Sequence, residues 1–269
     1  MKKLLVIAAF ITSMIACSKN SITGRNQLAL LSENELRTMA AQEYQQFLSQ
    51  NRVVTANSSR DAEMVRRVGQ RLTNAITQYY SQKGLKEELA GYQWEYNLVD
   101  SKEVNAWAMP GGKMVVYSGL LPVTQNEAAL AVVIGHEITH ALAKHGNERM
   151  SQTLLAQGIQ VVGGVLTSGN ERISNIFNNV YGPAASIGVL LPNSRKQELE
   201  ADRFGLIFTA MAGYNPQEAV PLWERMAAAS QGNRPPEFLS THPSEETRIE
   251  RLKALMPEAL KYYKPMKNR

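Results

Sequence analysis

The chain has a single cysteine, Cys17, among its 269 residues. A lone cysteine cannot form a disulfide within the chain, so a small disulfide-stapled scaffold is excluded. Charged residues make up only 20% of the sequence, without a long acidic or basic block, and hydrophobic residues make up 44%. This composition argues against a largely disordered chain. It supplies enough apolar side chains for one sizeable hydrophobic core.

The sequence also lacks a stripe of Lys and Arg interleaved with aromatic residues, because its basic residues are scattered. A formal net charge of +5 distributed in this way does not favour a nucleic acid as partner. No segment repeats at a fixed period. The apolar stretch at the N-terminus ends by Ala16 and is too short to cross a bilayer as a helix.

The N-terminus has the pattern of a secretory signal. Lys2 and Lys3 precede the apolar residues 4–11, and Met14-Ile15-Ala16-Cys17 resembles a bacterial lipobox. We therefore predict a signal peptide over residues 1–16, a lipid on Cys17, and a lipidated tether over residues 17–31. A plain signal peptide followed by an incidental cysteine is the alternative. The lipid would fix the protein to a membrane. The expected location is a bacterial cell envelope, on the periplasmic side and at the outer membrane, because a serine rather than an aspartate follows Cys17.

The hydrophobic periodicity predicts helices and a small sheet. Capping boxes and apolar spacing indicate helices that begin after residues 32, 59 and 124, the last running to about residue 144. Period-two patterns predict strands over residues 92–99, 104–109 and 113–117, with a turn at 110–112. Further helices are expected over residues 195–212, 216–230 and 245–256, and residues 152–167 are expected to form a core-packing or interfacial helix. The predicted domain covers residues 32–256, followed by a tail over 257–269.

The strongest chemical signal is His136-Glu137-Ile138-Thr139-His140 in a strongly apolar helix. At about 100° per residue, His136 and His140 lie about 40° apart on one face, so both imidazoles can bind one metal ion. Glu137 is offset by one residue and can take a proton from the water that attacks a carbonyl. This spacing is typical of zinc hydrolases. The alternative is a pair of solvent-facing histidines on a core helix.

A third ligand has to come from elsewhere in the chain. His145 is about 140° around a continuous helix from His140, which predicts a surface or helix-end histidine. The metzincin pattern fails because Ala143 and Gly146 occupy its glycine and third-ligand positions. Glu198 and Asp202 share a helix face and fit a ligand with a carboxylate behind it. On spacing alone, however, residues 198–202 equally fit a solvated acidic face.

Four segments, taken in order, resemble the HtpX-like and CAAX-protease-like zinc metallopeptidases, in particular the periplasmic lipoprotein branch of the LoiP and BepA kind. They are residues 105–112 (NAWAMPGG), the histidine motif 136–140, the ExxxD motif 198–202, and Thr241-His242-Pro243 with Arg248. The resemblance covers about residues 32–256. It departs from the HtpX type, whose members carry transmembrane helices around the zinc site. We therefore predict an α+β, mostly helical zincin of the gluzincin type, with a small β-sheet beside the histidine helix.

The resemblance implies one zinc ion per chain, held by His136, His140 and Glu198. Glu137 would be the catalytic base, and Asp202 would lie behind a ligand and orient it. The strand formed by Asn105, Ala106, Trp107 and Ala108 would pair with an extended substrate peptide.

Each of His242 and Arg248 has an alternative interpretation beside the one that the resemblance implies. The His-Pro histidine of such enzymes can approach the zinc as an additional, regulatory ligand, so His242 would gate the site or help to stabilise an oxyanion. The alternatives are a loop residue at a helix entry for His242 and a surface charge for Arg248.

The sequence thus predicts a zinc metalloendopeptidase that cleaves unfolded or misassembled cell-envelope proteins, a role in protein quality control. One alternative is a mostly latent zinc-site protein that binds clients as a chaperone. Another is a zinc hydrolase of small molecules or cell-wall amides. The sequence does not indicate an oligomeric state.

Overall fold

The computed structural model describes residues 17–57, 59–159, 161–162, 165–166, 171–182, 194–229, 238–239, 242 and 247–265. The expected signal peptide and two residues of the His-Pro motif, Thr241 and Pro243, lie outside this part. The helices are α2 (Glu33–Gln50), α3 (Arg60–Gln82), α4 (Leu121–Thr124), α5 (Glu127–Leu142), α6 (His145–Ala156), α7 (Glu171–Tyr181), α8 (Ser194–Met211), α9 (Ala219–Ala229) and α11 (Arg248–Leu260). The strands are β1 (Cys17–Lys19), β2 (Asn26–Leu28), β3 (Val53–Val54), β4 (Glu95–Val99), β5 (Ala106–Met109), β6 (Lys113–Tyr117), β7 (Val161–Val162) and β8 (Val165–Leu166).

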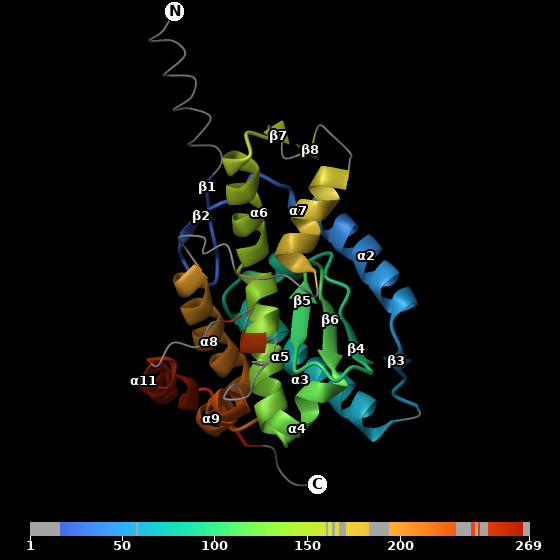
Figure 1. The fold of residues 1–269 in the computed structure, drawn as a ribbon. Helices are drawn as coiled ribbons and strands as arrows, with labels where there is room; N and C mark the ends of the chain where they lie inside the picture. The colour runs from blue at the N-terminus through green and yellow to red at the C-terminus, as the bar shows by residue number, and fades with distance from the viewer. Residues whose placement is uncertain are drawn as a thin grey trace, which may run out of the picture.

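A four-stranded mixed sheet lies inside the molecule, with the strand order β3-β4-β6-β5 (Figure 1). β4 and β6 run parallel, and β5 and β6 form the expected antiparallel hairpin. Side chains of β6 alternate between two hydrophobic clusters, because successive residues of a strand point to opposite faces. Met114 and Val116 join the cluster formed with α3, α5, α8, α9 and α11. Val115 and Tyr117 join the cluster formed with α2, α6 and α7, so both faces are covered.

Helix α5 is the central helix of the larger cluster, and α8 packs along it (Figure 1). Every residue from Ala129 to Leu142 is buried. The two backbones approach closely at Gly135 and Gly205. A Cβ atom added to Gly205 would lie 2.9 Å from the backbone nitrogen of His136, and one added to Gly135 would lie 3.0 Å from the Gly205 carbonyl oxygen. This approach brings the two predicted metal-binding motifs together.

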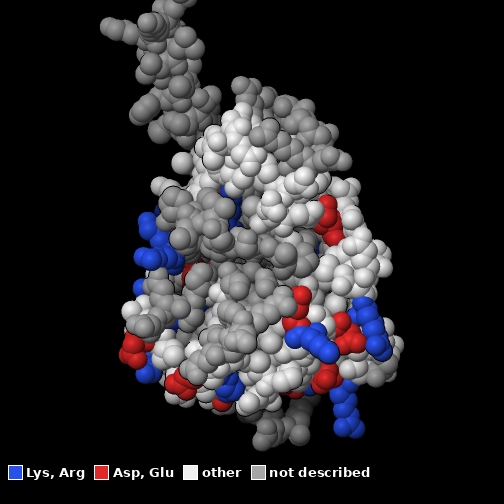
Figure 2. Space-filling model, in the orientation of Figure 1, with Lys and Arg blue, Asp and Glu red and all other residues white. Residues whose placement is uncertain are grey.

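The surface of the described residues carries both signs of charge. On the face in Figure 2, lysines and arginines are interspersed with acidic residues. Among the described residues, no helix combines the length and the apolar character that crossing a membrane requires.

The helix that carries the histidine motif does not begin or end where the sequence predicts. Its N-cap is Asn126, whose Oδ1 accepts from the Ala129 N–H, whereas Thr124 ends the short helix α4. The helix stops at Leu142, and Lys144 adopts the left-handed conformation with φ 56°. Lysine rarely takes this conformation, so the sequence gives no sign of the break. A new helix, α6, then begins at His145.

The predicted helix over residues 152–167 is wrong beyond α6. Gly158, with φ 66°, follows the end of α6. Val161 and Val162 then pair with β8 in an antiparallel ladder. β-Branched side chains fit this pleated arrangement better than a helix.

Within residues 17–31, the predicted tether, β1 and β2 form an antiparallel hairpin. The connection is held by Asn20, whose side-chain oxygen accepts from the backbone N–H groups of Ile22 and Thr23. Asn20 and Gln27 are buried against the domain. At the other end, α11 continues to Leu260, past the predicted boundary at residue 256.

Candidate metal centre

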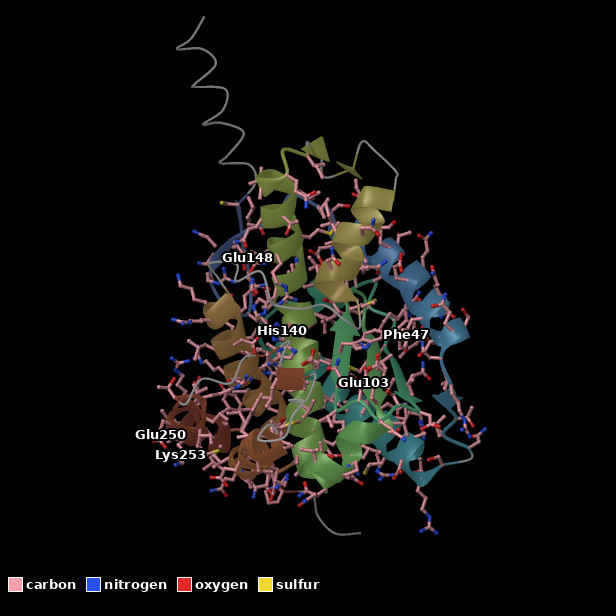
Figure 3. The ribbon with its side chains drawn as sticks, viewed as in Figure 1. Phe47, Glu103, His140, Glu148, Glu250 and Lys253 are labelled. Carbon is pink, nitrogen blue, oxygen red and sulfur yellow. The ribbon has the colours of Figure 1, made fainter. Side chains whose placement is uncertain are left out.

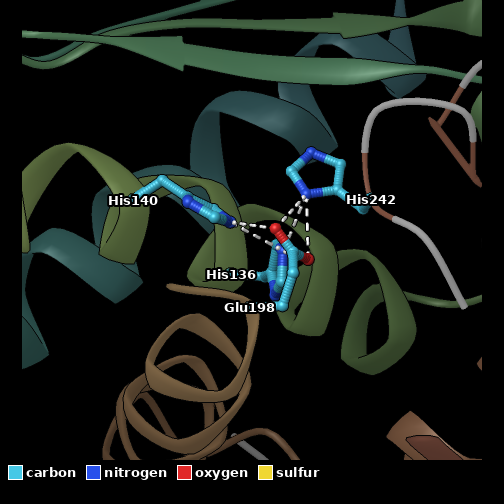
Figure 4. Close-up of side chains that lie close together, drawn as sticks. All are labelled: His136, His140, Glu198 and His242. Atoms are coloured by element: carbon cyan, nitrogen blue, oxygen red, sulfur yellow. Dashed lines mark hydrogen bonds and ion pairs between the residues drawn. The ribbon is translucent and has the colours of Figure 1, made fainter. Parts of the chain in front are cut away.

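Four buried side chains direct their donor atoms toward one point (Figure 4). His136 and His140 come from α5, Glu198 comes from α8, and His242 comes from the C-terminal part of the chain. Their ligand atoms all lie within 4.8 Å of one another. The structure therefore brings together the three predicted ligands and the histidine of the His-Pro motif.

The spacing of these donors suits a tetrahedral ion. His136 Nε2 lies 3.1 Å from His140 Nε2, 3.2 Å from His242 Nδ1 and 3.4 Å from Glu198 Oε2. Glu198 Oε1 lies 3.3 Å from His140 Nε2 and 3.1 Å from His242 Nδ1. Ligands about 2.0–2.1 Å from a zinc ion at tetrahedral angles are roughly 3.3 Å apart. Three imidazole nitrogens and a carboxylate at this spacing fit zinc.

The electrostatics of the cluster favour a cation. Burial opposes the charged form of His242, but the carboxylates of Glu198 and Glu137 outweigh it and raise the pKa of His242 to about 10. Burial also opposes ionisation of Glu198, yet His242 and His140 hold the pKa of Glu198 well below its usual range. Burial lowers the pKa of His140 well below its usual value, which leaves a neutral imidazole of the kind that binds metals.

Glu137 lies beside the four donors without being one of them. Its Oε1 is 3.1 Å from His242 Nε2, and the side chain is buried. A carboxylate placed in this way can accept a proton from a molecule bound at the cluster, while its lone pairs stay off the metal. Its position agrees with the one-residue offset in the sequence.

Asp202 lies behind His136, in the place that the family resemblance implies for it. The Asp202 Oδ1 atom is 3.0 Å from His136 Nδ1 and accepts from Arg248 Nη2 at 2.7 Å. Burial opposes ionisation of Asp202, but Arg248 and His136 lower its pKa below the usual value. Arg248 is itself buried, and its guanidinium carbon lies 3.6 Å from the centre of the Trp223 ring. The alternative of a surface charge for Arg248 is therefore wrong.

His145 lies behind His140, where the sequence predicts no partner. The two Nδ1 atoms are 2.9 Å apart, and His145 is fully buried. His145 does lie at a helix end, as the first residue of α6, but the interpretation as a surface histidine is wrong because the 140° projection assumes one continuous helix. The break at Lys144 turns the first residue of α6 back toward the cluster.

Beyond His145 lies an ionic network that the sequence analysis does not find. His145 Nε2 is 2.9 Å from Glu200 Oε2, and Arg25 contacts Glu200 through Nε at 2.7 Å. Arg25 also donates to both carboxylate oxygens of Glu148, at 2.6 and 2.7 Å. Gln197 donates to Glu148 as well. Figure 3 labels His140 and Glu148, which come from α5 and α6.

The predicted substrate strand is the edge of the sheet. β5 pairs with β6 on one side only, and Asn105 directly precedes it. Ala106 joins the larger cluster, whereas Trp107 packs edge-on against Tyr44 and Phe47. Just before this strand, the Val104 carbonyl accepts from the Phe238 N–H at 3.0 Å. The segment with His242 therefore touches the chain next to the edge strand.

Comparison with known proteins gives a family and several relatives. Residues 63–256 match Peptidase family M48. The chain is 36% identical over 172 residues to the mitochondrial metalloendopeptidase OMA1 of Schizosaccharomyces pombe, covering 64% of this chain and 49% of that protein. It is 29% identical over 250 residues to the human protein named metalloendopeptidase OMA1, mitochondrial, covering 89% of this chain and 46% of that protein. It is 28% identical over 186 residues to the beta-barrel assembly-enhancing protease of Escherichia coli, covering 65% of this chain and 37% of that protein.

These comparisons correct the expected location. The relatives at 35–36% identity are named as mitochondrial proteins, which contradicts the prediction of a bacterial envelope and an outer membrane. The prediction relied on the lipobox-like residues up to Cys17, a short pattern. In the structure Cys17 is an exposed, free cysteine. The chain spans about half or less of the length of the curated relatives named above.

Proposed function

The chain belongs to peptidase family M48, and on that premise we propose that it is a zinc-dependent endopeptidase that cleaves extended segments of unfolded or misassembled proteins. His136, His140 and Glu198 bind the zinc, and Glu137 is the general base. One observation supports this most directly. The Glu137 carboxylate lies next to the four-donor cluster and is not among its donors. A purely structural zinc site has no use for such a base.

Family membership confirms several expectations from the sequence. These are the kinship with the HtpX-like metallopeptidases, the mostly helical zincin fold with a small sheet, the zinc cofactor and the class of metalloendopeptidase. The lipoprotein branch, the lipid on Cys17 and the domain boundaries remain predictions. The envelope origin of the substrate no longer has support, because it depended on the contradicted location.

The residues of the chain have separate tasks in the proposed reaction. A zinc ion, when bound, supplies a Lewis acid that polarises the peptide carbonyl and makes water more acidic. Glu137 accepts the proton of the attacking water and returns it to the leaving amine. Asp202 accepts from His136 Nδ1, which leaves Nε2 free to bind the metal. The edge strand β5 offers backbone groups to an extended peptide, a mode that tolerates many sequences.

A second candidate, a mostly latent protein that binds clients, has support from His242. The Nδ1 atom of this histidine completes a set of four protein donors. Structural zinc sites have four protein ligands, whereas catalytic sites keep one position open. Within the described structure the geometry is therefore that of a closed site, which needs His242 to move away before a substrate can bind.

The decisive experiment compares the full chain with Glu137→Gln for zinc content and for cleavage of unfolded casein. The proposal expects about one zinc per chain in both proteins. Cleavage should fall by roughly 10²–10⁴-fold in the variant, the usual contribution of a general base. A chelator should abolish cleavage by the parent. Equal cleavage by both proteins would exclude Glu137 as the base, and an absence of zinc in both would refute the ligand assignment.

A further inference from the structure

The two ligand histidines of α5 have different partners behind them. His136 faces a carboxylate directly, through Asp202. His140 faces a second imidazole, that of His145, and only beyond it a carboxylate, that of Glu200. We propose that His145, Glu200 and Arg25 form a positioning relay that fixes the ring and the tautomer of the zinc ligand His140. This inference rests on the proposed function, because it takes His140 as a zinc ligand.

The hydrogen positions along the relay follow from the metal end. His140 Nε2 points to the other donors, so its lone pair is available to the zinc and its proton is on Nδ1. That N–H donates across 2.9 Å to His145 Nδ1, which must therefore be the unprotonated nitrogen of a neutral ring. His145 then carries its proton on Nε2 and donates to Glu200 Oε2 across 2.9 Å. Each contact has one donor and one acceptor, so the chain of bonds is consistent.

Arg25 closes the relay from a distant part of the sequence. It sits in the connection between β1 and β2, and one guanidinium contacts both Glu200 and Glu148. The two glutamates come from α8 and α6. A planar guanidinium in contact with two carboxylates has little rotational freedom, since each contact restricts the plane. Arg25 thus holds the Glu200 carboxylate turned toward His145.

The break at Lys144 is what makes this relay available. In a continuous helix, His145 would face away from His140. The left-handed residue redirects the chain, so the first residue of α6 is fully buried against the second ligand. A purely structural function for His145, holding α6 in place, would stabilise the fold without affecting the metal. The two roles therefore differ in their effect on zinc affinity.

The experiment measures zinc affinity by competition with a chromophoric chelator and the melting temperature of the zinc-free protein, in the full chain and four variants. His145→Phe keeps a ring of similar shape and removes both hydrogen-bonding nitrogens. His145→Asn places an amide oxygen where Nδ1 accepts. Arg25→Met breaks the far end of the relay. Arg203→Met is the matched control, because Arg203, also on α8, makes a similar two-bond contact with Glu258 of α11.

Loss of a partner behind a metal-ligating histidine typically weakens metal binding about 10–100-fold. We expect a loss of this size in His145→Phe, a smaller one in His145→Asn and in Arg25→Met, and no change in Arg203→Met. Unchanged zinc affinity in His145→Phe, or equal losses in the Phe and Asn variants, would overturn the relay.

If His145→Phe does not fold, the zinc affinity of Arg25→Met is compared with that of Arg203→Met. Equal zinc affinities in these two variants would overturn the proposal. A parent that binds no zinc would instead refute the proposed function.

Discussion

The Nε2 atom of His242 lies 3.1 Å from Oε1 of Glu137, while its Nδ1 lies 3.1 Å from both carboxylate oxygens of Glu198. One imidazole thus contacts the proposed base and a proposed ligand at the same time. In the proposed reaction an attacking water would need the place beside Glu137 that this imidazole fills. Phe238, four residues before His242, donates its backbone N–H to the Val104 carbonyl beside the edge strand. Phe238 and His242 therefore connect the metal cluster with the chain beside the edge strand β5.

Replacing His242 by Ala should open this site. Removing the fourth donor leaves three protein ligands and one free position, the arrangement of catalytic zinc sites. We expect faster cleavage of unfolded casein at saturating zinc, together with weaker zinc binding. The control is the double variant with Glu137→Gln, which should remain inactive. Slower cleavage by His242→Ala with one zinc still bound would show that the histidine assists the reaction and does not block it.

The buried pair of Asp202 and Arg248 should matter for stability even without metal. Arg248→Met leaves the Asp202 charge buried without its cation, which typically costs about 3–5 kcal/mol of unfolding free energy. Urea unfolding of the zinc-free protein measures this loss. Arg203→Met, which breaks a partly exposed pair with Glu258, should cost about 1 kcal/mol or less. Adding Asp202→Asn to Arg248→Met should recover part of the stability, and a further loss would contradict the pairing.

Gly205→Ala should separate α8 from α5. The added Cβ would meet backbone atoms of Gly135 and His136, which cannot rotate away as a flexible side chain can. Overpacking of this kind costs roughly 1–3 kcal/mol. Because Glu198 and Asp202 are on the displaced helix, zinc affinity should fall in the same variant. Leu199→Ala, at an exposed position of α8, is the control and should leave both quantities nearly unchanged.

The stability contributed by Glu127 should depend on pH. Burial opposes ionisation of this carboxyl, but hydrogen bonds from Arg67 and Tyr214 lower its pKa below the usual 4.5. A lowered folded-state pKa contributes stability above the unfolded pKa, and that stability is lost as the pH falls through the folded value. The difference in melting temperature between the parent and Glu127→Gln should therefore be largest near neutral pH and shrink below about pH 4.5. Arg67→Met should weaken this dependence, and a difference that is constant with pH would contradict it.

The parts of the site that could be predicted from the sequence are those that one helix determines. His136, Glu137 and His140 are neighbours on α5, and the helical period alone places them correctly. Glu198 could not be selected by spacing, because its approach to α5 depends on two glycines that allow the helices into contact. Glu198 was instead identified as a ligand through the family resemblance, which depends on four segments in order.

The relay behind His140 shows why the remaining features could not be predicted. Arg25 is 123 residues from Glu148 and 175 residues from Glu200, so no local pattern connects them. The orientation of His145 depends on a left-handed lysine, where glycine or asparagine would have indicated a break. The strands were easier to predict, since β6 has the predicted bounds. The parallel pairing of β4 with β6 again joins segments that no turn connects.

The order of the metal donors along the chain has a consequence for biosynthesis. His136 and His242 are separated by 106 residues, and Glu198 lies between them. A ribosome that adds about 5–20 residues per second needs roughly 5–20 s to cover this distance. During the first part of that interval, before Glu198 is added, a growing chain has its base and two histidines but neither of the other donors. The three proposed ligands are therefore together only once Glu198 has been added, so a growing chain that ends before this residue cannot form the proposed catalytic site.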